Sequence, residues 1–377
     1  MKALKVAVVG VGHLGRVHAR ILSKMQGVRL VGVVDVSAQQ RDAVAEACRT
    51  NAFPDHLAVA DKIDAAVIAT PTKYHHAVAM DLIRRGIHLL VEKPLAVTPE
   101  QGEELVAAAR AAGVVLQVGH VERFNPAVTA AGPWLREPKW IEGRRLGGFA
   151  CRILDVGVVL DLMIHDIDLV LAATGEKPNR VEAAGLALFG QHEDIAQATL
   201  RFPGGCVAQL TASRLSYQPE RKMQVWSEAG FASLDFATRS ATVIRPHEAV
   251  YERSLDAAQL SPEMRDELRE HMFDKYLVKE TITPEPADQI TAELEDFATA
   301  IRTSSKPRVD GAAGLAALDV AQQVLAAMER HAWDGERGHR FGPKVQPLPH
   351  VLPGPHFLRR AAQLADAELS DAADQRD

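Results

Sequence analysis

The chain has 377 residues, of which 47% are hydrophobic, and a formal net charge of −6 from 43 basic and 49 acidic side chains. This length predicts about two domains, and the mild acidity argues against a nucleic-acid-binding surface. The three cysteines, Cys48, Cys151 and Cys206, are widely spaced without a CxxC pair, which argues against a disulfide framework or a zinc cluster.

The beginning of the chain carries no recognisable targeting signal. Residues 1–10 run directly into a strand-like segment, without the charged, apolar and small-residue regions of a signal peptide. No apolar run reaches the length that a membrane-spanning helix needs. We therefore expect a soluble cytoplasmic protein.

The first predicted elements are a strand, a glycine-rich turn and a helix. Residues 5–9 are continuously apolar, as in a strand buried on both faces of a sheet. The sequence GVGHLG follows at 10–15, a helical pattern comes next, and a second apolar strand at 28–34 ends at Asp35. This order predicts a dinucleotide-binding site, whereas an ordinary glycine turn between strand and helix is the alternative.

Each glycine of this motif has a predicted role. Gly10 permits the tight turn, Gly12 lets a pyrophosphate approach the backbone, and Gly15 allows helix and strand to pack closely. The pyrophosphate would lie at the N-terminus of the helix. Asp35 can accept hydrogen bonds from ribose hydroxyls and would repel a 2′-phosphate, and no arginine directly follows it. We therefore expect NAD rather than NADP as the cofactor.

Alternating helices and strands continue to residue 121 and predict a parallel, doubly wound sheet. Thr98 is a suitable N-cap, with Pro99 at the first helical position. The predicted elements are a helix at 40–49, a strand at 65–69, a helix at 75–86, a strand at 89–92, a helix at 99–112 and a strand at 114–119.

The strand at 89–92 ends in Glu92, Lys93 and Pro94. Pro94 has no backbone N–H and favours an extended Lys93, so the strand should stop there. Lys93 would then lie at the carboxyl end of a strand, where open α/β sheets bind their ligands. The alternative is an ordinary surface charge. Glu92 would either hold the Lys93 ammonium or face water.

Several other residues of this first region are candidates for the cofactor site. Thr70 and Pro71 end the preceding strand and are expected to line the nicotinamide side. His13 and His18 have no predicted catalytic role and can be polar residues satisfied locally. His75 and His76, at a helix start, are either caps or site residues. The expected cofactor-binding residues are Gly10, Gly12, His13, Leu14, Gly15, Asp35, Thr70, Pro71, His75, Glu92 and Lys93.

A helical segment at 155–170 carries Asp161 and His165. Four positions apart, the two side chains share one face of an α-helix, where the carboxylate can orient the imidazole as a general base. The alternative is a polar stripe on an amphipathic helix. Asp161, His165 and Asp168 also have metal-binding side chains, but the proposed chemistry needs no metal.

The second predicted domain, 122–332, is an open, mainly antiparallel sheet with helices on one face. We expect the other face to bind a second subunit in a homodimer or homotetramer. Arg214, Arg221 and Lys222 lie near strand ends, where they contact an anionic substrate or are plain surface charges. Predicted strands are 181–189, 195–202, 206–213, 222–227, 232–236 and 241–245, predicted helices are 287–303 and 311–331, and 254–280 is charged and helix-like.

Together these motifs resemble the glucose–fructose oxidoreductase/inositol dehydrogenase (Gfo/Idh/MocA) family. The matching segments are GVGHLGRVHA at 10–19, EKP at 92–94 and DLMIHDID at 161–168. The resemblance spans roughly residues 3–332 and implies a sugar dehydrogenase with a Rossmann domain, 1–121, followed by an α+β domain. It also implies that Lys93 and His165 act at the sugar carbon that exchanges hydride with NAD, with Asp161 as the partner of His165.

Within the family, VGHVERFNPAV at 118–128 and the segment 154–171 are most similar to UDP-N-acetylglucosamine 3-dehydrogenases. This similarity implies oxidation of a 3-hydroxyl to a ketone, which an aminotransferase converts to a 3-amino sugar for lipid A. Alternatives are a UDP-glucuronate, free-sugar or inositol dehydrogenase, and a non-catalytic NAD sensor. The proline-rich arm or tail, 333–377, departs from the family pattern. The expected substrate-binding residues are Lys93, Arg123, Phe124, Asn125, Asp161, His165 and Arg214.

Overall fold

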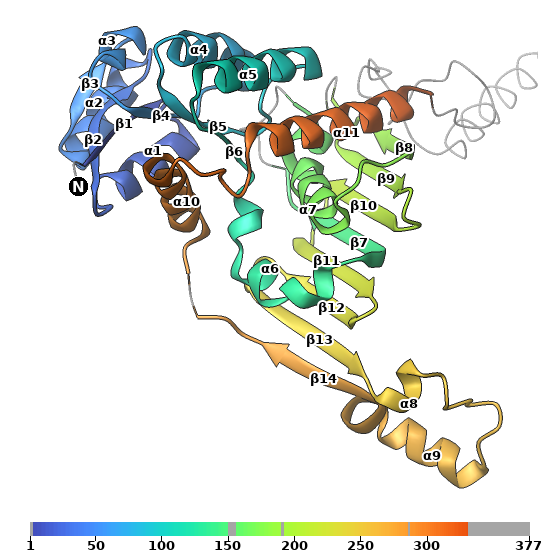
Figure 1. Ribbon diagram of the computed structural model, residues 1–377. Helices are drawn as coiled ribbons and strands as arrows, with labels where there is room; N and C mark the ends of the chain where they lie inside the picture. The colour runs from blue at the N-terminus through green and yellow to red at the C-terminus, as the bar shows by residue number, and fades with distance from the viewer. Residues whose placement is uncertain (1–2, 150–155, 190–191, 286, 331–377) are drawn as a thin grey trace, which may run out of the picture.

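The computed structural model describes residues 3–149, 156–189, 192–285 and 287–330. The predicted arm at 333–377 lies outside the described residues. Two β-sheets organise the chain (Figure 1). We call the six-stranded sheet with its helices the first unit and the eight-stranded sheet with its helices the second unit.

The first sheet is parallel throughout and has the strand order β3-β2-β1-β4-β5-β6, as in a doubly wound dinucleotide-binding fold. Its strands are β1 (Leu4–Val9), β2 (Val28–Val34), β3 (Asn51–Phe53), β4 (Ala65–Ile68), β5 (His88–Glu92) and β6 (Leu116–Gly119). Its helices are α1 (His13–Leu22), α2 (Ala38–Cys48), α3 (Leu57–Ala60), α4 (His75–Ile83) and α5 (Pro99–Ala112), with a short 3₁₀ turn, η1 (Thr72–Tyr74).

The second sheet is mixed and has the order β14-β13-β12-β11-β7-β10-β9-β8. All neighbouring strands are antiparallel except β7 and β10, which are parallel. Its strands are β7 (Pro138–Leu146), β8 (Arg180–Leu186), β9 (Ile195–Arg201), β10 (Val207–Ser213), β11 (Glu220–Ser227), β12 (Gly230–Asp235), β13 (Ser240–Pro246) and β14 (Leu277–Ile282).

The remaining helical segments lie between and after these strands. Short segments are η2 (Val121–Phe124), α6 (Pro126–Ala130), η3 (Gly132–Leu135), α8 (Glu248–Tyr251) and two π-helical turns, η4 (Val159–Met163) and η5 (Met272–Tyr276). Longer helices are α7 (Ile164–Thr174), α9 (Pro262–Glu270), α10 (Gln289–Thr303) and α11 (Gly311–Arg330).

Local chemistry explains the helix ends that the sequence predicted. The Thr98 hydroxyl accepts a hydrogen bond from the backbone N–H of Gln101, and Pro99 opens α5. Along β1, Val6 and Val8 pack into one face of the sheet while Ala7 and Val9 face the other. Both faces are therefore covered, as the continuous apolar run predicted.

Three strands escaped sequence prediction, β3, β7 and β14. Strand β7 lies in the middle of the sheet, but one of its inward-facing residues is the charged Arg145, which is buried in ion pairs with two carboxylates. The sequence of β7 therefore lacks the alternation of apolar and polar residues that marks a strand. No residue of β14 is buried, because this edge strand belongs to an arm that projects beyond the sheet with α8 and α9 (Figure 1). A strand with no buried face does not need alternating apolar and polar residues, so periodicity cannot detect it.

The two last helices connect the units. Leu294 and Phe297 of α10, a helix expected in the second domain, join the core of the first unit beside Val6 and Val8. The domain boundary at 121/122 stays a prediction. The structure adds that α10, which lies far beyond this boundary in the sequence, packs against the first unit.

Helix α11 contributes to the cores of both units. Leu318 belongs to the core of the first unit, and Val320 and Val324 belong to that of the second. Contrary to the sequence expectation, α11 is long and apolar enough, by length and composition, to cross a membrane, but half of it is buried inside the protein. We assign it to the interior as a core helix.

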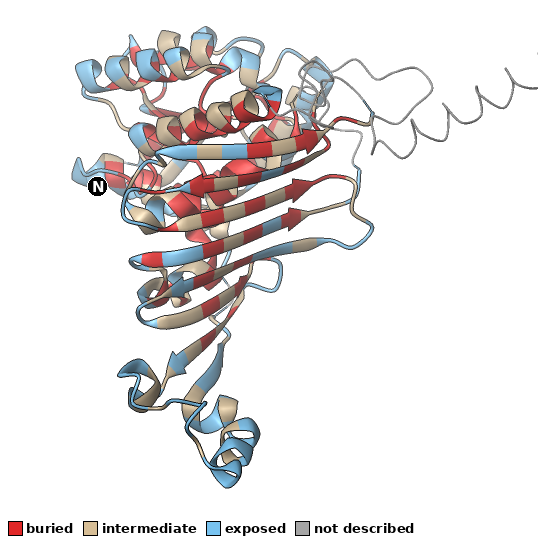
Figure 2. Cartoon of the chain, turned by 90° about the vertical axis from the view of Figure 1, so that its right-hand side faces the viewer, coloured by how far each residue is buried: buried red, intermediate tan, exposed pale blue. Residues whose placement is uncertain are grey.

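In the part of the chain that the structure describes, no helix covers one face of the second sheet (Figure 2). Trp140 and Trp226 lie opposite each other on β7 and β11, each 37% exposed, and the ring centroid of Phe231 lies 4.8 Å from that of Trp226. Aromatic side chains in a row on an open sheet are typical of an interface.

Candidate active site

The glycine turn after β1 is tightly packed at two positions and open at a third. Gly10 has φ +86°, and a Cβ atom there would lie 2.7 Å from the backbone nitrogen of Thr70. A Cβ atom on Gly15 would lie 1.8 Å from the carbonyl oxygen of Gly10. Around Gly12 nothing lies within 4 Å of the Cβ position. The backbone of Gly12, at the N-terminus of α1, is therefore accessible to a phosphate group.

Asp35 ends β2 and organises the next turn through its carboxylate, which accepts hydrogen bonds from the backbone N–H groups of Val11 (2.9 Å) and Ser37 (2.8 Å). Arg41 donates to the Asp35 carbonyl oxygen at 3.4 Å. A cleft of about 560 Å³ opens here, and five of the predicted cofactor residues line it, Gly10, Gly12, Asp35, Thr70 and Pro71. An acid, an open glycine turn and a cleft in this order fit a dinucleotide.

The other cofactor candidates fall into two groups. His13 and Leu14 begin α1 and are exposed. His75 is buried, with Nδ1 2.9 Å from the Pro94 carbonyl oxygen and Nε2 2.8 Å from that of Thr70. Burial lowers the pKa of His75. This side chain connects the turns that follow β4 and β5.

Glu92 is buried next to the cofactor helix. Its Oε1 lies 2.7 Å from Nε2 of His18, and its Oε2 accepts a hydrogen bond from the backbone N–H of Lys93. Burial opposes ionisation of Glu92, but the hydrogen bond and charge of His18 outweigh it and lower its pKa. Glu92 therefore supports the backbone of Lys93, and its carboxylate binds His18 instead of the ammonium.

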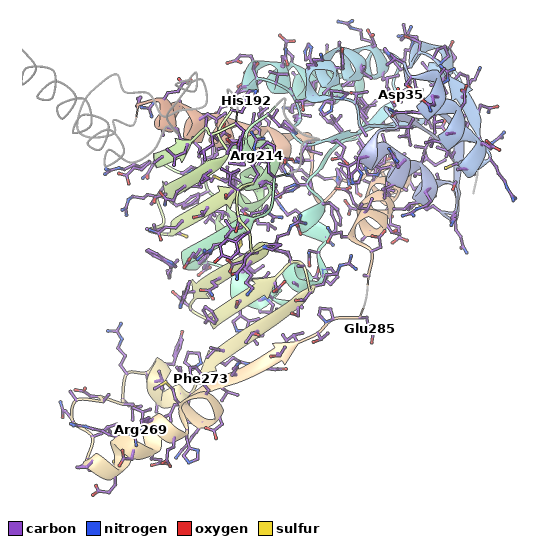
Figure 3. The ribbon with its side chains drawn as sticks, turned by 180° about the vertical axis from the view of Figure 1, so that it is seen from behind. Asp35, His192, Arg214, Arg269, Phe273 and Glu285 are labelled. Carbon is purple, nitrogen blue, oxygen red and sulfur yellow. The ribbon has the colours of Figure 1, made fainter. Side chains whose placement is uncertain are left out.

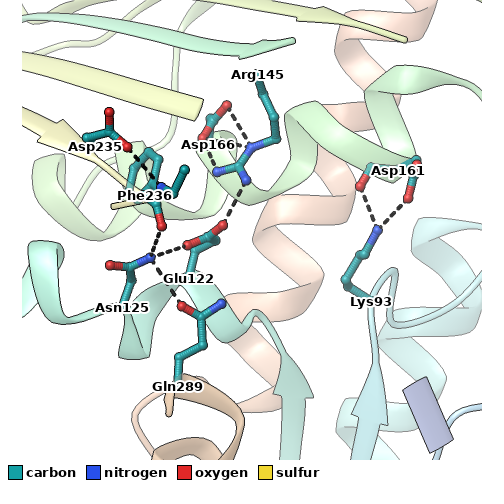
Figure 4. Close-up of polar contacts among 10 residues, drawn as sticks. Lys93, Glu122, Asn125, Arg145, Asp161, Asp166, Asp235, Phe236 and Gln289 are labelled. Carbon is teal, nitrogen blue, oxygen red and sulfur yellow. Dashed lines mark hydrogen bonds and ion pairs between the residues drawn. The ribbon is translucent and has the colours of Figure 1, made fainter. Parts of the chain in front are cut away.

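The Lys93 ammonium binds the second unit (Figure 4). Its Nζ donates to the Asp161 carboxylate at 2.9 Å and to the Asp161 carbonyl oxygen at 2.6 Å. The Lys93–Pro94 peptide bond is cis. The Lys93 side chain is 13% exposed and that of Asp161 23%, so both can be reached from outside.

A π-helical turn explains why Asp161 meets Lys93 rather than His165. The backbone N–H of Ile164 bonds to the carbonyl oxygen of Val159, five positions earlier, so the helix is wider here than an α-helix. Side chains four positions apart no longer lie one above the other. Among the described residues, no hydrogen bond joins Asp161 to His165.

His165 lies at the start of α7 and is partly exposed, although its Nδ1 is buried without a partner among the described residues. Burial, followed by the charge of Lys93, holds the pKa of His165 well below its usual value. The imidazole is therefore neutral and can accept a proton on the ring nitrogen that carries no hydrogen. The ring of His120 stands edge-on to it, with centroids 6.1 Å apart.

The segment 123–125, expected to bind substrate, is held largely by protein contacts. Arg123 makes two hydrogen bonds to Asp168, at 2.6 and 2.9 Å. Phe124 is buried under the guanidinium of Arg308, which lies 4.8 Å from its ring centroid. Asn125 is fully buried and caps α6. Of these candidates, the structure leaves only Arg123 partly accessible.

A buried polar network fixes this segment against β7 and α7 (Figure 4). Arg145 donates to Glu122 at 2.8 Å and to Asp166 at 2.7 Å. Burial disfavours the charged form of Arg145, but the two carboxylates outweigh it and raise its pKa. Asn125 adds hydrogen bonds to Glu122 and to Gln289 of α10. The network therefore fixes the orientation of the helix that carries His165.

Arg214 lies in the second unit, apart from Asp35 in the first (Figure 3). It pairs with Asp194 and donates to the carbonyl oxygen of Val156 at 3.2 Å. Next to Asp194, the buried Glu193 accepts a hydrogen bond from the backbone N–H of Val159 at 2.9 Å. Burial raises the pKa of Glu193 to about 7. These groups hold the start of the helix that leads to Asp161.

Sequence reasoning missed four residues that shape the site, His120, Glu122, Arg145 and Glu193. His120 and Glu122 belong to a segment that was noticed as a block, but no pattern marks which of its side chains point inward. Arg145 and Glu193 are charged residues in strands or loops, for which exposure is the normal expectation. Only tertiary contacts reveal them.

Comparison with known proteins agrees with this geometry. Residues 4–120 match the model of the Gfo/Idh/MocA oxidoreductase family with an NAD-binding Rossmann fold, and residues 120–233 match that of the family's C-terminal domain. A UDP-N-acetylglucosamine 3-dehydrogenase from Acidithiobacillus ferrooxidans is 36% identical over 331 residues, which cover 86% of this chain and 97% of the relative.

Solved structures and a second relative extend the comparison. A crystal form of the same dehydrogenase superposes with a TM-score of 0.76 at 34% identity, covering 87% of this chain and 99% of the other. The scyllo-inositol 2-dehydrogenase (NAD⁺) of Bacillus subtilis is 28% identical over 232 residues, which cover 56% of this chain and 68% of the relative. The chain therefore belongs to the Gfo/Idh/MocA family of NAD-binding oxidoreductases, and NAD is its cofactor.

Proposed function

We propose that this protein oxidises the 3-hydroxyl of a UDP-sugar with NAD, and that the sugar is UDP-N-acetylglucosamine. One fact supports the substrate and another supports the reaction. The similar Acidithiobacillus enzyme carries that activity in its name and aligns over almost the whole chain. The second fact is the pairing of Lys93 with Asp161 beside a neutral His165, which supplies the groups that alcohol oxidation needs.

The single observation that carries the proposal is the position of Lys93. It follows β5 at the carboxyl edge of the first sheet and contacts the second unit. Bound NAD supplies the acceptor for a hydride. His165 takes the proton of the hydroxyl on Nε2, and Lys93 donates a hydrogen bond to the same oxygen as negative charge develops there. Asp161 fixes the ammonium.

The uridine diphosphate carries negative charge that needs a partner. Arg214 remains our candidate for this contact because a guanidinium can bind a phosphate through two parallel hydrogen bonds. Its guanidinium also lies 5.4 Å from the ring centroid of Phe149. Arg123 is a second candidate at the edge of the site. Phe124 and Asn125 act on substrate only through the shape of their segment, because they are buried.

A direct test mixes the protein and NAD with UDP-N-acetylglucosamine, UDP-glucuronate, N-acetylglucosamine and inositol, and follows the absorbance of reduced cofactor. Turnover with the first compound alone supports the proposal. Turnover with only one of the other compounds would show that the protein is a different sugar or inositol dehydrogenase of the family. NAD binding without turnover on any of the four favours the sensor.

Two substitutions test the site itself. Lys93→Met and His165→Ala should each lower turnover by about 10²- to 10⁴-fold while NAD affinity changes little, because neither side chain holds the dinucleotide cleft together. Lys177→Met and His271→Ala, at exposed positions away from the site, are the matched controls. Near-normal turnover in either site variant would sink the assignment.

We further propose that the open face of the second sheet binds a second copy of the chain. The aromatic row containing Trp140 and Trp226 supports this arrangement. Light scattering should show a dimer or tetramer for the native chain and smaller species for Trp140→Glu. The 3-keto product suits an aminotransferase as the next enzyme, and a cytoplasmic location remains a prediction.

A further inference from the structure

The carboxylate of Asp161, which the sequence suggested as the orienting group of His165, binds Lys93 instead. A histidine that accepts a proton on Nε2 must carry its own hydrogen on Nδ1, and the partner of that N–H fixes the tautomer. Nδ1 of His165 is buried, with no partner among the described residues.

The imidazole of His120 lies edge-on to that of His165 and is in a position to replace Asp161. It follows β6, as Lys93 follows β5, and the registered pair Glu92 and Gly119 places both side chains at the same edge of the sheet. His120 is completely buried, and neither of its ring nitrogens has a partner among the described residues.

Orphaned nitrogens of this kind are rare because an unsatisfied buried polar atom costs about 1–3 kcal/mol. Three lie together here, the two ring nitrogens of His120 and Nδ1 of His165. The rings are edge to face with centroids 6.1 Å apart, which is longer than a direct hydrogen bond between two imidazoles allows. Contacts in catalytic sites commonly shorten when substrate binds, and a single buried water also spans such a gap.

The electrostatic surroundings favour a neutral ring as acceptor. Burial, as the largest influence, lowers the pKa of His120, and its charged neighbours carry both signs, Asp168 and Glu92 against Arg123 and Lys93. A neutral His120 retains one unprotonated nitrogen, which can accept the hydrogen of His165 directly or through one water.

We propose that His120 is a positioning residue that fixes the tautomer of His165, by accepting the hydrogen of its Nδ1 directly or through one water. The role rests on the proposed function, in which His165 is the base. His120 does not touch the reacting hydroxyl. Its effect is to keep Nε2 of His165 unprotonated and directed at the substrate.

The first measurement needs no substrate. Side-chain ¹⁵N NMR of histidine-labelled protein, with His165→Gln to assign the signal, reports which ring nitrogen of His165 carries the hydrogen. We expect the Nδ1–H tautomer in the native chain. In His120→Leu we expect a mixture of both tautomers, and in His120→Gln, whose amide oxygen can accept, mainly the native form. His88→Gln, at the opposite end of β5, is the control and should leave the signal unchanged.

The second measurement is kinetic and uses the holoenzyme. His120→Leu should lower kcat by about 10- to 100-fold with the sugar KM within about threefold, and His120→Gln should recover most of the loss. If His120 only filled space, the leucine and glutamine variants would have the same kcat.

The outcomes separate this inference from the proposed function. An Nε2–H tautomer in the native chain overturns the role of His120, as does a leucine variant with native tautomer and kcat. If the leucine variant fails to bind NADH and has therefore misfolded, the native and glutamine spectra still decide. A native enzyme that oxidises no sugar overturns the proposed function and leaves the tautomer measurement valid.

Discussion

Lys93 Nζ lies 2.9 Å from the Asp161 carboxylate and 2.6 Å from the Asp161 carbonyl oxygen, so one ammonium group binds both the side chain and the backbone of a single residue. The two residues are 68 positions apart and belong to different units. The contact therefore sets where the nucleotide-binding sheet and the helix carrying His165 meet.

Asp161→Asn tests the charge in this contact. The amide keeps the size and one acceptor but loses the charge-assisted bond, so Lys93 is held less firmly. We expect kcat to fall by about 10- to 100-fold with NAD affinity nearly unchanged, measured by steady-state kinetics and NADH fluorescence. Asp319→Asn removes a partly exposed aspartate that pairs with Lys177 and should leave both quantities unchanged. Native kcat in Asp161→Asn would contradict the role.

Gly12 and Gly15 should respond differently to alanine. A methyl group at position 12 enters open space, so stability should stay within about 0.5 kcal/mol while NAD binds at least about tenfold more weakly. A methyl group at position 15 meets the Gly10 carbonyl oxygen and should cost about 1–3 kcal/mol or more. Urea unfolding and calorimetric NAD titration separate the two effects. Equal losses of stability in both variants would refute this explanation.

Gly157 is required by the packing of Glu193. A Cβ atom there would lie 2.0 Å from one carboxylate oxygen of Glu193 and 2.1 Å from the other, and would push the carboxylate away from the Val159 N–H. Gly157→Ala should therefore lower the free energy of unfolding by about 1–3 kcal/mol. Gly132→Ala, where nothing lies within 4 Å, is the control and should change it by less than about 0.5 kcal/mol. Equal stability in the two variants would exclude this packing.

Glu193 should make stability depend on pH near neutrality. Its folded-state pKa of about 7 exceeds the ordinary value of 4.5, so the folded protein holds this proton more tightly than the unfolded chain. The resulting stability is complete below about pH 4.5 and is lost as the pH rises through about 7.

Glu193→Gln removes this titration while keeping an acceptor for Val159. Relative to the native chain, its free energy of unfolding should rise by up to about 3 kcal/mol between about pH 4 and 8. Urea unfolding at a series of pH values measures the difference. Glu182→Gln, exposed on β8, should instead keep the native pH profile. A constant difference between Glu193→Gln and the native chain would rule out the titration.

Sequence periodicity predicted most of the first unit because its inner strands are buried on both faces. The exception is β3, a short edge strand that is largely exposed. The glycine motif, the acid at Asp35 and the strand ending at Lys93 follow from rules that act over a few residues. Strands β8 to β13 of the second unit were found for a different reason, because apolar residues alternate along them on the face that packs into the core.

The features that sequence did not reveal depend on contacts between distant segments. Arg145 is buried in a central strand only because Glu122 and Asp166 reach it from two helical segments. The pairing of Asp161 with Lys93 depends on a π-helical turn, and the rule for side chains four apart assumes an α-helix. The facing rings of His120 and His165 need both units to be in place.

The return of α10 to the first sheet makes the two halves of this chain inseparable. A fragment ending after β6 would leave bare the surface that Leu294 and Phe297 cover, and would be prone to aggregate. The nucleotide-binding half is therefore not a module that recombination can transplant by itself. A chimera that exchanges the sugar-binding half for that of a relative must take its α10 from the same parent as its first sheet.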